Sequence, residues 1–193
     1  MTAKTKIAFS RERLAIRVKQ LGLAISKDYA GRTLDVVMML ENSFMFGADL
    51  VRAISAPLVC HFVRAEMRDI RMDGFDRREV FFSPPPVLKG RDVLVLDVVL
   101  NTGVTQDFLL RRLEEGKPRS LRLAVLFDNP DARKVNLQPE YTGFSAASKH
   151  WMGYGLGDRE GLYRNLPYVA SSISVPSGRK KHQKGTRRKV SKG

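Results

Sequence analysis

The chain has 193 residues, 43% of them hydrophobic, which suffices for one domain with a substantial core but not for two of ordinary size. No apolar run reaches the roughly 18 residues of a membrane-spanning helix, and the first residues lack the apolar stretch of a signal peptide, so we expect a cytoplasmic protein without a membrane partner. The one cysteine, Cys60, excludes an internal disulfide; it lies in an apolar run and is expected to be a small core residue.

The formal net charge of +14 is concentrated near one end of the chain. Eight Lys and Arg residues and no acidic residue lie between positions 179 and 193. Such a segment cannot bury enough apolar surface to offset its conformational entropy. We therefore expect a folded domain over residues 1–176 and a disordered basic tail over 177–193. The tail would either bind RNA or another polyanion through phosphate contacts or only improve solubility.

The first elements expected along the chain are a helix, a strand and a second helix. Ser10 is a suitable N-cap for the first helix, and Gly22 inside it predicts an imperfection, because Gly costs about 1 kcal/mol relative to Ala there. The helix should bury one apolar stripe, which consists of Leu14, Val18, Leu21 and Ile25. Residues 33–40 then predict a strand, 41–43 a turn and 44–54 a helix.

The middle of the chain is less regular. Residues 57–63 predict another parallel strand, whereas the charged residues 64–78 show no clear period and predict a mobile excursion rather than packed structure. Residues 79–82 could form a strand of a flanking hairpin, and the prolines at 84–86 predict an extended connector.

The most informative stretch is 93–105. A buried parallel strand is expected where mostly β-branched apolar residues run up to the turn at 101–103, and a helix follows. The inward face of that helix is predicted to consist of Val104, Phe108, Leu109 and Leu113. Such a turn presents free backbone N–H groups to an anion, and Gly103 permits close approach. The alternative is an ordinary strand-turn-helix corner.

Strands alternating with helices predict an α/β fold with a doubly wound, mainly parallel sheet. A further strand at 120–127 ends at the turn residues 128–131. Ligands of such sheets bind at the carboxyl ends of the strands, where the turns 41–43, 101–105 and 128–131 all fall. We expect one site there, the alternative being three unrelated surface turns.

Over roughly residues 7–170 the sequence resembles the hypoxanthine-guanine phosphoribosyltransferases, which have the type I phosphoribosyltransferase fold. The resemblance is carried by residues 40–50, 93–105 and 117–121, and most specifically by PEYTGF at 139–144, GYGL at 153–156 and YRNLPY at 163–168. It implies a small flanking hairpin or hood, transfer of a phosphoribosyl group to a purine with Mg²⁺, and binding of a purine nucleotide or phosphoribosyl pyrophosphate. A homodimer or homotetramer is also implied.

The resemblance assigns the 5′-phosphate to a loop that consists of Asn101, Thr102, Gly103, Val104 and Thr105. Asp97 takes the first of two acidic positions that contact the ribose and organise Mg²⁺, and Val98 takes the second, which valine cannot serve. Asn101 stands where the family has the aspartate thought to act as the base. An amide cannot take a proton at neutral pH, and loss of a general base costs about 10²–10⁴-fold in rate.

The remaining site residues are implied in two groups. On the pyrophosphate side, Arg164 matches the family's arginine, whereas Glu41 and Asn42 replace its basic and glycine residues. On the base side, four residues are implied: Asn129 in place of the purine-specifying lysine, His150 in place of the stacking aromatic, Trp151 beside it, and Asp158 in place of a displaced acid. Asp158 is also a metal-ligand candidate together with Asp97, and core packing is the alternative for Trp151.

These substitutions predict a family member that keeps phosphate binding while its transferase activity is impaired. The alternative is a catalytically inactive, nucleotide-responsive regulatory or RNA-binding protein that uses the basic tail.

Overall fold

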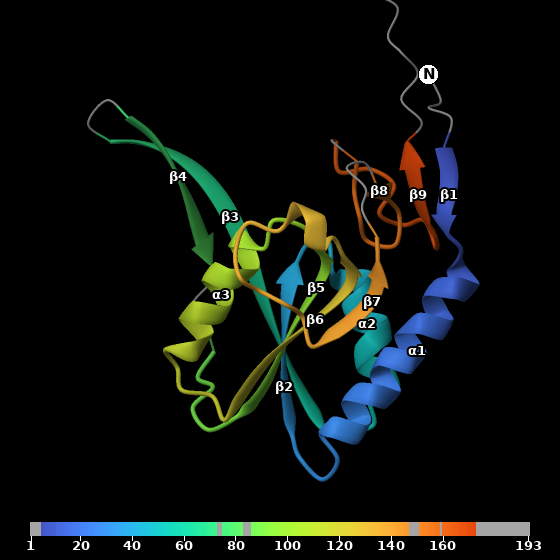
Figure 1. Ribbon diagram of the computed structural model, residues 1–193, viewed down its shortest axis with the longest axis vertical. Helices are drawn as coiled ribbons and strands as arrows, with labels where there is room; N and C mark the ends of the chain where they lie inside the picture. Colours follow the sequence, from blue (N-terminus) through green and yellow to red (C-terminus); the bar gives the residue numbers. More distant parts are fainter. Residues whose placement is uncertain (1–4, 73–74, 83–85, 147–150, 159, 173–193) are drawn as a thin grey trace, which may run out of the picture.

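The computed structural model describes residues 5–72, 75–82, 86–146, 151–158 and 160–172, and for residues 65–82 the backbone alone. Its centre is a six-stranded sheet of order β4-β3-β2-β5-β6-β7 (Figure 1). The strands are β2 (Leu34–Leu40), β3 (Leu58–Met72), β4 (Phe75–Phe82), β5 (Asp92–Leu100), β6 (Ser120–Asp128) and β7 (Tyr141–Ser145). All neighbours pair in parallel except β3 and β4. The doubly wound, mainly parallel sheet predicted from the sequence is thus confirmed.

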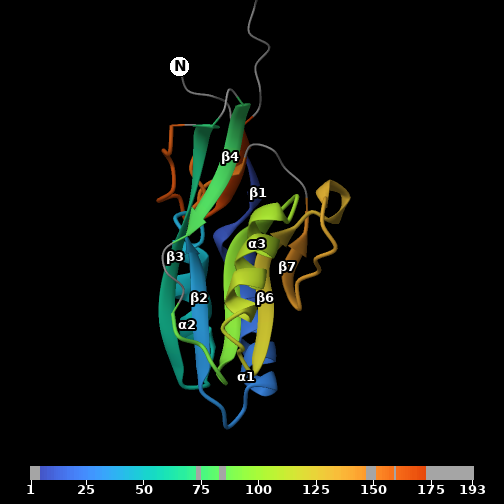
Figure 2. The same ribbon diagram turned by 90° about the vertical axis from the view of Figure 1, so that its left-hand side faces the viewer.

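Helices cover both faces of this sheet. They are α1 (Arg11–Asp28), α2 (Phe44–Ala53) and α3 (Val104–Glu114). In Figure 2, α3 lies in front of the sheet and the other two helices behind it. Side chains alternate along the central strands, so that Leu94 and Leu96 join the core with α1 and α2, while Val93 and Val95 join the core with α3. Burial on both faces explains why these strands read as continuous apolar runs.

The first helix begins as predicted, since the Ser10 hydroxyl accepts a hydrogen bond from the Arg13 N–H at 3.3 Å. The predicted stripe is buried in full. The imperfection expected at Gly22 is absent, because α1 runs through this residue without a break. A Cβ at Gly22 would lie 2.5 Å from both the Cβ and the carbonyl oxygen of Ala53. The glycine thus lets α1 and α2 pack closely.

Residues 64–78 were predicted to be a mobile excursion without packed structure, but residues 64–72 and 75–78 belong to two strands. Strand β3 continues to Met72, and β4 returns antiparallel to it, from Met72 opposite Phe75 to Ala65 opposite Phe82. The prediction failed because a two-stranded ribbon is held by backbone hydrogen bonds, which need no apolar period. The ribbon extends away from the rest of the sheet (Figure 1).

The prediction for the inward face of α3 was only half correct. Leu109 and Leu113 are buried as predicted, but Val104 and Phe108 are 47% and 46% exposed. The face that meets the sheet passes through Gln106, Leu109 and Leu113, which are spaced by three and four residues.

A second, antiparallel sheet forms the hood over the carboxyl ends of the main strands. It has the order β1-β9-β8 and consists of β1 (Thr5–Phe9), β8 (Trp151–Met152) and β9 (Val169–Ser172). None of these strands, nor β7, was expected from local pattern. The predicted basic tail at 177–193 lies outside the described residues. Among the described helices, none is long and apolar enough to cross a membrane.

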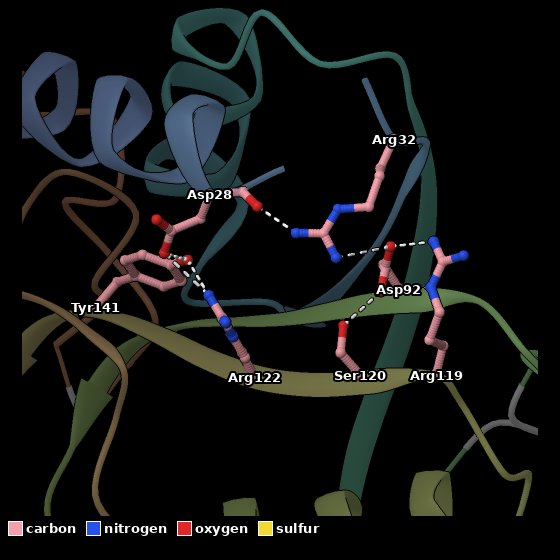
Figure 3. A network of polar contacts seen from close by, with 7 residues as sticks. All are labelled: Asp28, Arg32, Asp92, Arg119, Ser120, Arg122 and Tyr141. Carbon is pink, nitrogen blue, oxygen red and sulfur yellow. Dashed lines mark hydrogen bonds and ion pairs between the residues drawn. The ribbon is translucent and has the colours of Figure 1, made fainter. Parts of the chain in front are cut away.

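A polar network closes the opposite, amino end of the sheet (Figure 3). Asp92 on β5 is fully buried and accepts hydrogen bonds from Arg119 and from the Ser120 hydroxyl. The Arg119 guanidinium lowers the pKa of the Asp92 carboxyl to about 2. Asp28 at the end of α1 accepts from the Tyr141 hydroxyl at 2.7 Å and from Arg122 at 2.9 Å. These contacts tie α1 to β6 and β7.

Candidate phosphate-binding site

The turns after β2, β5 and β6 lie along the carboxyl edge of the main sheet. Strands β2, β5 and β6 are adjacent, and Leu100 at the end of β5 lies opposite Asp128 at the end of β6. The turn after β6 contacts the turn after β5 twice: the Asn129 N–H donates to the Leu100 carbonyl at 2.9 Å, and the Asn129 amide donates to Asn101 Oδ1 at 3.2 Å. The fold thus brings Asn101 and Asn129 together.

The loop 101–105 has the geometry of an anion cradle. Gly103 is the N-cap of α3 and has a left-handed backbone, with φ of 78°. The first intrahelical bond runs from the Asp107 N–H to the Gly103 carbonyl at 2.8 Å. Helical geometry therefore leaves the N–H groups of residues 104–106 without an intrahelical acceptor, at the positive end of the helix dipole. Thr102 in the same turn is exposed, and Thr105 in the first turn of α3 is half-buried.

Glycine is required at position 103 for two reasons. A side chain would disfavour the left-handed backbone, and a Cβ would lie 2.8 Å from Val135 Cγ2. The loop is also clamped from outside, since the Lys134 N–H donates to the Thr102 carbonyl at 2.9 Å.

Arg133 is a functional candidate that the sequence reading missed. Its guanidinium donates to the Asn101 carbonyl at 3.1 Å and forms an ion pair with Asp128. With its charge paired to Asp128, it joins the turns at 101 and 128 beside the loop. No local signal marks it, because Arg133 follows a turn in an irregular segment and its partner Asn101 is 32 residues away.

Asp97 lies beneath α3 rather than at the open edge. It is buried, and its carboxylate accepts from Gln106 Nε2 at 2.6 Å and from the Val98 N–H at 2.7 Å. Burial raises the pKa of the Asp97 carboxyl to about 6, although both hydrogen bonds act in the opposite direction. Val98 is buried in the core on the other face.

The described residues do not fit the Mg²⁺ that the family resemblance implies. Both Asp97 oxygens already accept hydrogen bonds, and valine at 98 has no donor atom for a metal. Asp158 Oδ1 accepts from the Glu160 and Leu162 N–H groups, both at 2.9 Å, and so closes its own turn. In the described ranges, no three His, Cys, Asp or Glu side chains gather in a way that could hold a metal ion.

The residues expected on the pyrophosphate side come together. Arg164 donates to Asn42 Oδ1 at 2.6 Å and to the Gly155 carbonyl at 2.7 Å, and its Nη2 lies 3.6 Å from Glu41 Oε2. Arg64 Nη2 lies 3.2 Å from the other oxygen of Glu41. A Cβ at Gly155 would lie 2.5 Å from the Asn42 carbonyl oxygen, so glycine there permits the contact between these two turns.

On the base side, the aromatic residue is part of the core. Trp151 packs against Phe127 and Phe9, with ring centroids 4.4 and 5.6 Å apart. This geometry supports the core-packing alternative for Trp151. His150 lies outside the described residues.

A glycine turn opens a helix at the carboxyl edge of a doubly wound sheet, which is where proteins of this fold class bind their ligands, and a small antiparallel hood covers that edge. Comparison with known proteins identifies the family of this chain. The model of the phosphoribosyl transferase domain matches residues 9–156. The chain belongs to this family.

Similar proteins within this family are named as hypoxanthine-guanine or hypoxanthine phosphoribosyltransferases. The hypoxanthine-guanine phosphoribosyltransferase of Staphylococcus epidermidis is 32% identical over 165 residues, which cover 86% of this chain and 92% of the relative. The crystal structure of such an enzyme from Bacillus anthracis, also 32% identical, superposes with a TM-score of 0.77 and covers 90% of this chain and 100% of its own. The crystal structure of a hypoxanthine phosphoribosyltransferase from Staphylococcus aureus is 29% identical and superposes with a TM-score of 0.78. The match covers 87% of this chain and 91% of that structure's chain.

Proposed function

We propose that this protein binds the 5′-phosphate of a purine nucleotide or of phosphoribosyl pyrophosphate at the loop 101–105, and that its transferase activity is impaired. The observation that carries the proposal is the left-handed Gly103 at the N-terminus of α3, which leaves the N–H groups of residues 104–106 available to an anion. The family membership supports a purine phosphoribosyl ligand, because the relatives are named for hypoxanthine and guanine.

Impaired transfer is supported by the side chains around the loop. The amide of Asn101 can donate a hydrogen bond to a base but cannot accept a proton at neutral pH, which removes a general base worth about 10²–10⁴-fold. Asp97 is buried, and both of its carboxylate oxygens are engaged by Gln106 and the Val98 N–H. What remains is binding and orientation: the loop amides hold the phosphate, and Arg133 holds the loop.

The proposal is tested by calorimetry with GMP and IMP on the native chain and on Gly103→Val. The native chain should bind both nucleotides. The variant should lose at least about tenfold in affinity, because its side chain would meet Val135 and disfavour the left-handed turn. Thermal unfolding of both proteins separates local loss of binding from loss of fold. Equal affinities would remove the loop from the site.

A turnover assay on the same protein tests the second half of the proposal. With phosphoribosyl pyrophosphate, Mg²⁺ and hypoxanthine or guanine, we expect little nucleotide. Turnover of about one per second or faster, an ordinary enzymatic rate, would refute impaired catalysis while leaving phosphate binding intact.

The second candidate function is contact with RNA or another polyanion through the basic segment. It rests on the eight Lys and Arg residues between 179 and 193, which are not balanced by any acid there. Such a segment would recognise phosphates without sequence preference and would act beside the nucleotide site rather than in place of it.

A further inference from the structure

One carboxylate at the edge of the sheet is held between two arginines from distant segments. Glu41 follows β2, Arg64 lies on β3 and Arg164 lies in the segment before the hood strand β9. Arg64 and Arg164 approach different oxygens of Glu41, at 3.2 and 3.6 Å. Arg164 is itself held in place by Asn42 and the Gly155 carbonyl, so its position does not depend on Glu41 alone.

This cluster is next to the phosphate loop. Strands β2 and β5 are parallel neighbours, with Met38 opposite Leu96, and their turns begin after Leu40 and Leu100. Adjacent strands are about 4.8 Å apart, so the Glu41 turn is the neighbour, on the β2 side, of a ligand whose phosphate rests on 101–105.

Two guanidiniums that converge on one point form a position for an anion, because phosphate and carboxylate are both recognised by arginine. In this chain the anion is already present as Glu41. A second phosphate group would have to displace the carboxylate from both arginines and then lie near its negative charge. A ligand with a single phosphate on the loop meets neither obstacle.

We infer that Glu41 acts as an internal anion, which fills the position between Arg64 and Arg164 and makes the site select nucleoside 5′-monophosphates over ligands that carry a diphosphate. This inference rests on the proposed function, since it takes the loop 101–105 as the position of the 5′-phosphate. It names Glu41 as a specificity-determining residue.

The test compares the native chain with Glu41→Gln, which keeps the shape of the side chain and removes its charge. Calorimetry is done with inorganic pyrophosphate, phosphoribosyl pyrophosphate and GMP. The variant should bind pyrophosphate and phosphoribosyl pyrophosphate about tenfold more tightly than the native chain, because a like charge near the bound anion is gone. Its affinity for GMP should change by less than about twofold.

Two further variants make the result specific. Glu114→Gln removes an exposed negative charge from the far end of α3 and should bind pyrophosphate as the native chain does. Arg164→Ala, added to Glu41→Gln, should abolish the gain, because it removes one of the two converging cations. If Glu41→Gln does not fold, Glu41→Ala removes the same charge.

Equal pyrophosphate affinity in the native chain and the Glu41 variants would overturn the inference, and so would an equal gain in Glu114→Gln. Absence of GMP binding to the native chain would refute the proposed function instead. The two failures are distinguishable, because the pyrophosphate comparison does not use GMP.

Discussion

Two buried aspartates on β5 show how neighbours decide the chemistry of a single residue. Asp92 faces the Arg119 guanidinium, which lowers the pKa of its carboxyl to about 2. Asp97 faces only neutral donors, Gln106 and the Val98 N–H, and burial raises the pKa of its carboxyl to about 6. The same residue type thus has a lowered pKa at the start of the strand and a raised pKa further along it.

The raised pKa of Asp97 predicts a pH-dependent contribution to stability. The Asp97 carboxyl has a pKa of 3.8 in the unfolded chain and binds its proton more tightly in the folded one. This tighter proton binding stabilises the folded state fully below pH 3.8, and the stabilisation is lost as the pH rises through about 6. Asp97→Asn cannot titrate. Urea unfolding of both proteins should therefore show the native chain losing on the order of 1 kcal/mol relative to the variant between about pH 5 and about pH 7.5. A constant difference would contradict the assignment.

At the scale of elements, the contact between α1 and α2 depends on one glycine that helix propensity disfavours. Gly22 lies inside the buried stripe of α1, where Ala53 of α2 occupies the space that a side chain would need. Close packing of two helices outweighs a propensity cost of about 1 kcal/mol.

Gly22→Ala is therefore expected to destabilise the protein, although alanine is the better helix former. Overpacking at a contact of 2.5 Å should cost about 1–3 kcal/mol, which lowers the melting temperature by about 2–4 °C per kcal/mol in a chain of this size. Thermal unfolding measures the change. The matched control is Lys19→Ala on the exposed face of the same helix, which should stay within about 0.5 kcal/mol of the native chain. A stabilised Gly22→Ala protein would show that the two helices can separate without cost.

At the scale of the whole molecule, the structural polar network and the candidate site lie at opposite ends of the sheet. The network of Asp28, Asp92 and their arginines joins elements at the amino end, and the turns at 41, 101 and 128 gather at the carboxyl end (Figures 1 and 3). Much of the net positive charge lies in residues 179–193, which are outside the described part of the chain.

Truncation after Gly178 tests whether that charge binds RNA. Each Lys or Arg that neutralises a phosphate on single-stranded RNA contributes about −0.7 to the slope of log affinity against log salt. The native chain should therefore bind a single-stranded RNA with a steeper salt dependence than the truncated chain, while GMP affinity is unchanged. An identical slope in filter-binding measurements would assign no RNA contact to the segment.

Sequence alone determined the features that depend on neighbouring residues. The strand, turn and helix over 93–114 follow from an apolar run, a glycine and a helical period, and the turns at the carboxyl edge follow from alternation of strands and helices. The family could be recognised for the same reason, since its motifs are contiguous. The pairing of β3 with β4 and the exposure of Val104 and Phe108 were missed because charge and apolar spacing do not specify the partner of a strand or helix.

Only the tertiary structure decided where the chemical groups point. It turned Asp97 toward Gln106 beneath α3, brought Arg133 onto the Asn101 carbonyl, and placed Glu41 between Arg64 and Arg164. It also paired β1 with β9, from opposite parts of the chain. Each of these contacts joins segments that are separate in sequence, and their energies come from packing and charge pairing between elements, so no local pattern records them.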